Sequence, residues 1–235
     1  MAHFKAELHV HTVLSPCAGI EMIPTAIVEE ALSRQLNLIA ITDHNASANV
    51  GAVVQAAQNT DLIVIPGIEL ETAEEIHLLC LFSTLLELEK FQDVVDRNLP
   101  PIQNNEDFFG SQLIVDADGD FIRKDERLLS NATYLSIEAA ITLVHKLGGI
   151  VIPAHIDREE NGILARLGTV PAELQLKTLE YSRYTSPEKM ISSYPELSDY
   201  RLIQGGDVHY PNDFLGKVEL SAVDTRISTI LKSLC

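Results

Sequence analysis

Short apolar runs alternate with amphipathic segments along most of the chain. The runs at residues 38–41, 62–65 and 150–152 are rich in β-branched residues and too short for helices, so they predict buried strands. Apolar positions spaced three or four residues apart, as within residues 24–32, predict helices between them. Strands that alternate with helices indicate parallel pairing, with helices covering the faces of the sheet.

The same pattern continues to the end of the chain. Further strands are predicted at residues 4–8, 76–82, 176–181 and 202–203, and further helices at about 49–58, 85–96, 137–147, from 187 onward and at 224–234. Ser136 is the expected N-cap of the helix that begins at residue 137. We count roughly seven strand–helix units and predict one α/β domain over residues 1–235.

The middle of the chain departs from this alternation. Prolines and asparagines at residues 100–105 break the helical pattern, and residues 112–123 predict a hairpin that turns at Asp-Gly. A calcium loop is excluded here, because Phe121 stands where glycine is needed and Arg127 where glutamate is needed. We therefore predict a small hairpin insertion at about residues 97–130, either a lid over the site or a dimer contact.

Composition narrows the class of protein. With 46% hydrophobic and 22% charged residues, the chain is typical of a soluble globular protein. No apolar stretch is long enough to span a membrane, and no apolar signal segment opens the chain, so we expect a cytoplasmic location. Three widely spaced cysteines do not indicate disulfides. The net charge of −17 makes extended nucleic acid an improbable partner, but bound cations would still allow a small phosphorylated substrate.

Imidazole and carboxylate side chains recur at the ends of the predicted strands. These residues are His9, His11, His44, Glu69, His77, His155, Asp207 and His209. Residues of this type are the usual ligands of zinc, manganese and iron. In an α/β barrel the carboxyl ends of the strands meet at one face, and a His-x-His pair on a strand directs both rings to the same side. The pattern therefore predicts a metal site at that face.

Each residue has a simpler interpretation when taken alone. A single histidine at a strand end binds metal in about one case in ten, by our prior. Six of the eight histidines share this placement, however, and His3 and His145 are the exceptions that we assign to structural roles. The acidic run of Glu71, Glu74 and Glu75 predicts a solvated face rather than a ligand set.

The motifs together resemble the PHP family, which is named for polymerase and histidinol phosphatase. The matching segments are His9-Val10-His11-Thr12, residues 39–45, residues 66–69, His77, residues 153–155 and residues 206–209. The resemblance runs from about residue 5 to 216, without residues 85–130. It implies a distorted (β/α)7 barrel with a cluster of two or three divalent metal ions, namely zinc, manganese or iron, at its mouth.

The resemblance also assigns ligands. It implies a first metal held by His9, His11, Glu69 and Asp207, a second metal held by Glu69, His77 and His155, and a third held by His44 and His209 with an aspartate that follows His-x-His. This chain has no such aspartate. Cys17 stands in that segment and would supply a thiolate, which favours zinc, unless the third site is weak and Cys17 is simply a small buried residue.

The function that follows is metal-dependent hydrolysis of phosphate esters of a small phosphometabolite or nucleotide, through a hydroxide that bridges the metals. Glu69 would set the metal spacing, and Asp207 would orient the hydroxide or take its proton. Arg158 and Arg183 are candidates for holding the substrate phosphate, although exposed salt bridges explain both residues better.

Two other functions remain open. The chain would act as a catalytically weak PHP module, a metal-stabilised scaffold or partner-binding domain, although eight of the nine expected ligands are kept. It would otherwise hydrolyse C–N bonds as amidohydrolases do, but no lysine lies beside the predicted cluster.

Overall fold

A curled sheet of six strands forms the centre of the molecule. The computed structural model describes all residues 1–235. The strands follow the order β10-β1-β2-β3-β4-β7, and their bounds are β1 Ala2–Val10, β2 Leu38–Ile41, β3 Ile63–Glu71, β4 His77–Leu81, β7 Ile150–Pro153 and β10 Val218–Ala222. Neighbours β1, β2 and β3 run parallel, whereas β4, β7 and β10 each join by antiparallel pairing. The fold is therefore mixed α/β.

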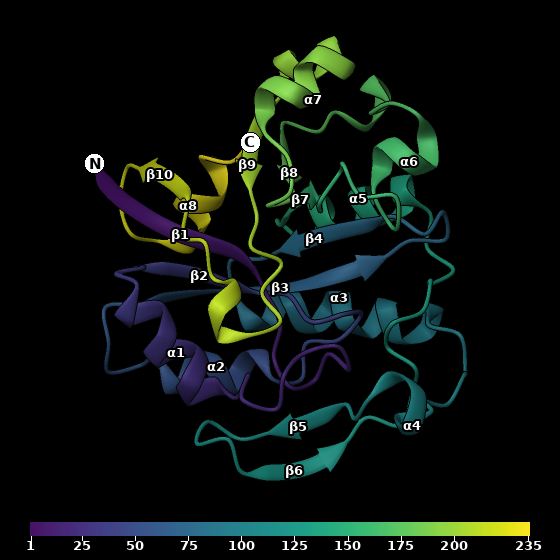
Figure 1. The fold of residues 1–235 in the computed structure, drawn as a ribbon. Helices are drawn as coiled ribbons and strands as arrows, with labels where there is room; N and C mark the ends of the chain where they lie inside the picture. The colour runs from purple at the N-terminus through teal and green to yellow at the C-terminus, as the bar shows by residue number, and fades with distance from the viewer.

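Helices cover the outside of this sheet, except α8, which packs on its inner face (Figure 1). Their bounds are α1 Pro24–Ser33, α2 Val50–Ala56, α3 Leu85–Asn98, α4 Glu106–Phe109, α5 Ile137–Lys146, α6 Ile163–Leu167, α7 Pro187–Ser193 and α8 Ile227–Lys232. In Figure 1, α1, α2 and α3 lie below the sheet, and α5, α6 and α7 lie at the upper right. Ser136 caps α5 as predicted, since its side chain accepts a hydrogen bond from the Ala139 amide.

The two faces of the strands have different partners. Alternate residues such as Ile39 and Cys80 pack outward into the larger apolar cluster with the helices. The intervening residues, such as Ala40, Ile65 and Leu79, form a second apolar cluster on the inner face with α8 and β10. Because side chains alternate along a strand, Glu69 shares the inner face with Ile65, four residues earlier on β3. The inner apolar cluster therefore forms the floor beneath the polar side chains.

A separate parallel pair lies against the ends of the curled sheet. Strands β8 Thr178–Tyr181 and β9 Arg201–Gln204 pair with each other. The Ile156 amide donates to the Glu180 carbonyl after β7, and a parallel bridge joins Val10 to Val208 after β9. The predicted count of seven strand–helix units is not confirmed, because β3 and β4 pair directly as a hairpin and β10 was not predicted.

Strand β3 is also longer than the sequence pattern predicts. The Pro66-Gly67 pair suggested the end of the strand, but pairing with β2 continues through Pro66 and pairing with β4 extends to Glu71. Proline fits because its carbonyl still accepts a hydrogen bond, here from the Phe82 amide. Glycine fits because a side chain at Gly67 would meet Leu81 and the backbone of Ile41. The extension places Glu69 inside the strand rather than after it.

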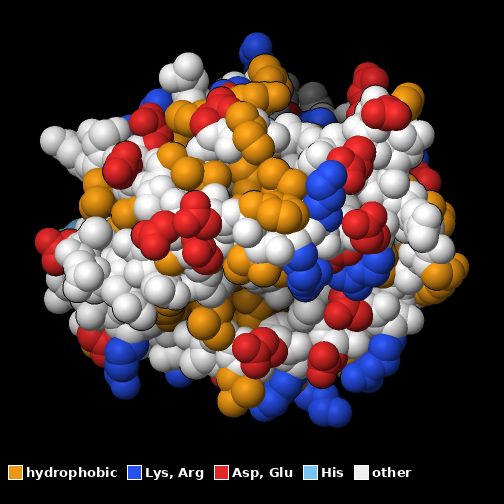
Figure 2. All heavy atoms as spheres, turned by 90° about the horizontal axis from the view of Figure 1, so that it is seen from below, with side chains coloured by type: hydrophobic (Ala, Val, Ile, Leu, Met, Phe, Trp, Pro, Cys, Tyr) orange, Lys and Arg blue, Asp and Glu red, His pale blue; other side chains and the backbone are white.

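The hairpin predicted at residues 112–123 is present as β5 Leu113–Val115 and β6 Phe121–Lys124, and residues 97–130 also contain α4, which was not predicted. The side chain of Asn49 fastens the hairpin at the start of α2, because it donates to the Leu113 carbonyl and accepts from the Val115 amide. Figure 2 shows hydrophobic side chains gathered on the lower face of the molecule. Phe108, Phe121 and Ile122 are the most exposed large apolar residues of this segment.

None of the helices has the length and apolar character needed to cross a bilayer.

Candidate metal centre

The carboxylate of Glu69 lies among five imidazoles. Its Oε1 is 2.8 Å from Nδ1 of His77 and 3.1 Å from Nε2 of both His9 and His155. Its Oε2 is 2.9 Å from Nδ1 of His44 and 3.3 Å from Nε2 of His11. Glu69 is completely buried. The structure thus brings together side chains that are up to 146 positions apart in the sequence (155 − 9).

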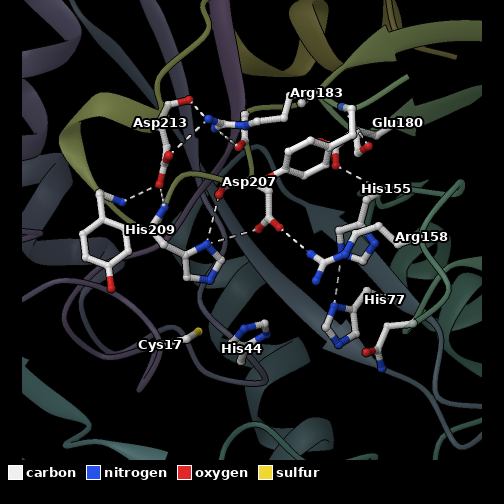
Figure 3. A pocket seen from close by; sticks show the side chains of 16 residues that line it. Cys17, His44, His77, His155, Arg158, Glu180, Arg183, Asp207, His209 and Asp213 are labelled. Carbon is white, nitrogen blue, oxygen red and sulfur yellow. Dashed lines mark hydrogen bonds and ion pairs between the residues drawn. The ribbon is translucent and has the colours of Figure 1, made fainter. Parts of the chain in front are cut away.

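The remaining predicted ligands lie above this group. Oδ1 of Asp207 is 3.3 Å from Nε2 of His9, 3.4 Å from Nε2 of His11 and 3.4 Å from Nδ1 of His209. The rings of His11 and His209 stack with their centroids 4.2 Å apart. All eight imidazole and carboxylate residues predicted from the sequence therefore form one cluster, and Figure 3 shows five of them around the cavity.

The donor atoms of this cluster suit metal ions. Three sets have their donor atoms within 4.8 Å of one another: His9, His11 and Glu69; His44, Glu69 and His77; and His11, His44 and His209. Nε2 of His9, Nε2 of His11 and Oε2 of Glu69 are buried without a hydrogen-bond partner. Buried polar atoms are normally paired, so unpaired donors that converge fit divalent cations.

Two further carboxylates position the imidazoles, and the sequence pattern did not identify them. Glu180 accepts hydrogen bonds through Oε1 from Nδ1 of His9, at 2.9 Å, and from the His155 amide, at 3.1 Å. Asp43 accepts from the Thr12 amide and hydroxyl and from the Ser15 hydroxyl. Carboxylates that hold the far nitrogen of a ligating imidazole fix its tautomer and orientation. The available signal for Glu180 was an acidic residue inside an apolar strand.

Glu7 is a third missed residue. It lies on β1, is fully buried, and accepts hydrogen bonds from the amides of Gly206, Leu215 and Gly216. Burial raises its pKa to about 7 although these hydrogen bonds oppose the shift. Its role is to hold the segment that carries Asp207 against β1. The prediction that Glu71 belongs to a solvated face is wrong. Its Oε2 lies 3.7 Å from Nε2 of His77, at the edge of the cluster.

The charges of the cluster are mutually dependent. Burial favours the neutral form of Glu69, but the positive charges of His77, His9 and His44 outweigh it and hold the pKa of the carboxyl well below its usual value. His11 shows the reverse: burial and the neighbouring His209 charge lower its pKa well below that of a free imidazole. These shifts favour the anionic form of Glu69 and the neutral form of His11, which are the forms that bind metal. Burial opposes the charged forms of His9, His44 and His77, but their acidic neighbours outweigh it and raise the pKa of these rings, so a bound cation would displace protons from them.

Cys17 lies at the rim of the cluster and is exposed, so the interpretation as a small buried residue is wrong. Desolvation opposes ionisation of its thiol, but the charge of His44 and hydrogen bonding with His209 and His44 lower its pKa to about 6. Figure 3 shows its sulfur directed towards His44.

A cavity of about 540 Å³ opens above the cluster, lined by His44, His155, Asp207 and His209. Both predicted arginines also line it. Nη1 of Arg158 donates to Oδ2 of Asp207 at 2.7 Å, and 42% of the Arg158 side chain is exposed. Arg183 instead donates to the carbonyls of Gly206 and Asp213 and to the Asp213 carboxylate, so it holds the backbone of this segment. Arg158 therefore keeps more of its N–H groups free for a ligand than Arg183 does.

The backbone is left-handed at two residues of the cluster. His155 has a φ of 28° and Asp207 a φ of 46°, whereas such angles are uncommon outside glycine and asparagine. Non-glycine residues held in this region cost about 1–3 kcal/mol each and gather at functional sites. The surrounding hydrogen bonds from Glu180 and Glu7 keep the two segments in place.

An α/β fold with a curled sheet and a buried cluster of imidazoles and carboxylates at strand ends defines a class of metal-site proteins. The PHP domain profile matches residues 7–180, which is more than half of the chain, and the chain belongs to the PHP domain family. No curated protein matches the sequence.

Solved structures share the fold at low identity. The lesion-specific endonuclease PfuEndoQ from Pyrococcus furiosus has a TM-score of 0.69 and 16% identity over 99% of this chain, but this chain spans only 56% of that protein. A candidate metal-dependent phosphoesterase from Bifidobacterium adolescentis has a TM-score of 0.56 and 19% identity over 88% of both chains. An amidohydrolase from Chromobacterium violaceum has a TM-score of 0.60 and 17% identity over 90% of both chains. These likenesses show the fold.

Proposed function

We propose that this PHP-domain protein is a metal-dependent phosphoesterase that hydrolyses a small phosphorylated substrate. The single observation that carries the proposal is Glu69, one buried carboxylate within 3.3 Å of five imidazoles from four segments of the chain. A carboxylate in this position links neighbouring cations, and two linked cations are the usual arrangement for phosphoryl transfer to water. The phosphoesterase and endonuclease names of structural neighbours support the same class of reaction.

The donor sets support two or three divalent cations. His9, His11, Glu69 and Asp207 would hold the first, Glu69, His77 and His155 the second, and His44 and His209 the third. When bound, such cations supply hydroxide near neutral pH and offset the charge of the phosphoryl oxygens. The identity of the metals, zinc, manganese or iron, is left to elemental analysis.

Residues above the cluster have separate roles in this proposal. Asp207 directs Oδ1 to the imidazoles of His9 and His11 and Oδ2 to Arg158, so it orients the attacking oxygen between the metal site and the substrate. Arg158 would bind the phosphate of the substrate, because its exposed guanidinium faces the cavity next to Asp207. Arg183 would act indirectly, by fixing the segment that presents Asp207.

The substrate is expected to be small. The net charge of −17 opposes a long polyanion, and the cavity volume of about 540 Å³ suits a phosphometabolite or a nucleotide. Endonuclease Q, in a related structure, holds a 27-mer duplex with an abasic lesion, so lesion-bearing DNA belongs in the test. The alternative of a metal-stabilised scaffold or partner-binding module predicts bound metal with no turnover.

The test compares three kinds of phosphate ester. We expect phosphate or nitrophenol release from para-nitrophenyl phosphate or its bis-ester in the presence of manganese or zinc, and no cleavage of abasic duplex DNA. Glu69→Gln should reduce the rate by more than about 100-fold, whereas Glu75→Gln, at an exposed position, should not change it. Metal-loaded protein that turns over no ester would contradict the proposal and favour the scaffold.

We also propose that residues 1–235 act as one distorted (β/α)7-type barrel with the insertion at about 97–130. The bridge between Val10 and Val208 and the hydrogen bond from Ile156 to Glu180 support this, because they join the β8–β9 pair to both sides of the sheet. A cytoplasmic location stays a prediction.

A further inference from the structure

One thiol lies among the imidazoles at the edge of the metal centre. Cys17 lines the cavity together with His44 and His209. It is the only one of the three cysteines near the cluster, since Cys80 lies buried on the outer face of β4 and Cys235 is the last residue. Figure 3 shows the sulfur, His44 and His209 on the same side of the cavity.

The imidazoles beside this thiol already converge. The donor atoms of His11, His44 and His209 lie within 4.8 Å of one another. His11 is completely buried and its Nε2 has no hydrogen-bond partner, although its Nδ1 is paired with the Ser15 hydroxyl. A buried nitrogen without a hydrogen-bond partner in such a group fits a metal ligand better than a packed core residue.

The loop that carries Cys17 is fastened on both sides to the residues that it faces. On one side, the Ser15 hydroxyl donates to Asp43 at 2.7 Å and accepts from the His44 amide at 3.2 Å. On the other side, the Gly19 amide donates to the His209 carbonyl at 2.9 Å. These contacts of Ser15 and Gly19 therefore hold the loop that carries Cys17 next to His44 and His209, independently of the thiol itself.

We propose that Cys17 binds a divalent cation as a thiolate, together with His44 and His209, and that this metal position prefers zinc to manganese. The proposal rests on the metal centre of the proposed phosphoesterase. On binding, the S–H bond breaks, a sulfur–metal bond forms, and the proton passes to solvent. Thiolate is a soft ligand that favours zinc, whereas the carboxylates of Glu69 and Asp207 also suit harder cations. The centre would then contain metal positions that differ in which cation they prefer.

Cobalt provides a direct test, because a thiolate bound to Co²⁺ produces a charge-transfer band in the near ultraviolet. We expect this band in the full-length protein loaded with cobalt and its complete loss in Cys17→Ser. Cys235→Ser is the matched control and should retain the band, since that thiol lies at the end of the chain. Circular dichroism verifies that each variant is folded. A wild-type protein that binds cobalt without the band, or a band that survives in Cys17→Ser, would overturn the proposal.

A second variant tests metal preference. Cys17→Asp replaces a soft donor with a hard one, so the ratio of zinc to manganese bound in competition should fall by roughly tenfold or more relative to the wild type. An unchanged ratio would contradict the proposed preference. Phosphate release is measured separately, so that an inactive protein with an intact cobalt band counts against the phosphoesterase and not against the thiolate site.

Discussion

At the scale of single residues, Glu180 shows how one side chain controls two ligands. Its Oε1 accepts from the His9 ring and from the His155 backbone, which belong to different metals in the proposed assignment. Because a carboxylate behind an imidazole fixes the ring and increases its basicity, a change at Glu180 alters metal binding without removing a ligand. Sequence patterns find ligands by residue type, whereas such positioning residues are defined only by what they touch.

Replacing Glu180 by glutamine is expected to weaken metal binding and turnover by roughly 10- to 100-fold, because the neutral amide supports the His9 ring less well. Metal content is measured by mass spectrometry and activity by ester hydrolysis. Glu219→Gln, an exposed change on β10, should match the wild type. Wild-type metal affinity in the Glu180 variant would show that its contacts do not tune the site.

Gly205 is expected to tolerate no side chain. A Cβ there would lie 2.2 Å from the carboxyl carbon of Glu180, so Gly205→Ala must displace that carboxylate and should cost roughly 1–3 kcal/mol in the free energy of unfolding. Gly51→Ala is the control: nothing lies within 4 Å of its Cβ, and alanine within α2 should stabilise by roughly 0.5–1 kcal/mol. Urea denaturation distinguishes the two, and equal stability of the variants would be inconsistent with the crowding at Gly205.

At the scale of elements, the strand ends that carry ligands were predictable, but their connections were not. The positions of His9 at the end of β1, of His11 just after it, and of the residues after β2 and β7 follow from short apolar runs that end in imidazoles. The hairpin of β3 and β4 was missed, because Pro66 and Gly67 are typical turn residues and only the pairing with β2 and β4 shows them within a strand. The pairing of β10 with β1 joins the two ends of the chain, which local periodicity cannot reveal.

Arg127 joins the insertion to α3, because it pairs with both Asp125 and Asp96, and Asp96 belongs to α3. Arg127 donates to Asp125 at 2.7 Å and to Asp96 at 2.6 Å. Burial opposes ionisation of Asp125, but the hydrogen bonds from Arg127 outweigh it and lower the pKa of this carboxyl. A group with a lowered folded-state pKa stabilises the fold above its unfolded pKa of roughly 4, and this stabilisation is lost as the pH falls through the folded pKa.

Asp125→Asn should therefore destabilise the protein at neutral pH by about 1–2 kcal/mol, and the difference from the wild type should shrink below about pH 4. Urea titrations over a series of pH values measure it, with Asp107→Asn on the exposed helix α4 as the control. A difference that stays constant into acid would show that ionisation of Asp125 does not contribute.

At the scale of the whole molecule, the metal centre joins segments from residue 9 to residue 209. The proposed ligands come from β1, β3, β4 and the segments after β1, β2, β7 and β9, and the hydrophobic cluster beneath them is shared by both ends of the chain. A cation that binds these residues together binds only the folded chain. Metal binding is thus coupled to the stability of the entire sheet rather than to one loop.

Removal of metal with a chelator should lower the melting temperature, and the shift should grow with metal concentration. At a free metal concentration about 100 times Kd, the expected stabilisation is about 2.7 kcal/mol per site. Differential scanning calorimetry measures it on chelated and reloaded protein, with Glu69→Gln as the variant that should not respond. A melting temperature that does not change with bound metal would mean that the metal does not bind the folded chain in preference to the unfolded chain.

The left-handed backbone at His155 and Asp207 affects which residues selection or engineering would keep at these positions. If His155 is kept at this angle because it binds metal as proposed, selection for heat resistance alone would replace it with glycine or asparagine. Lineages or libraries released from the need for turnover should therefore lose this histidine early, and their descendants would melt at higher temperature while binding less metal.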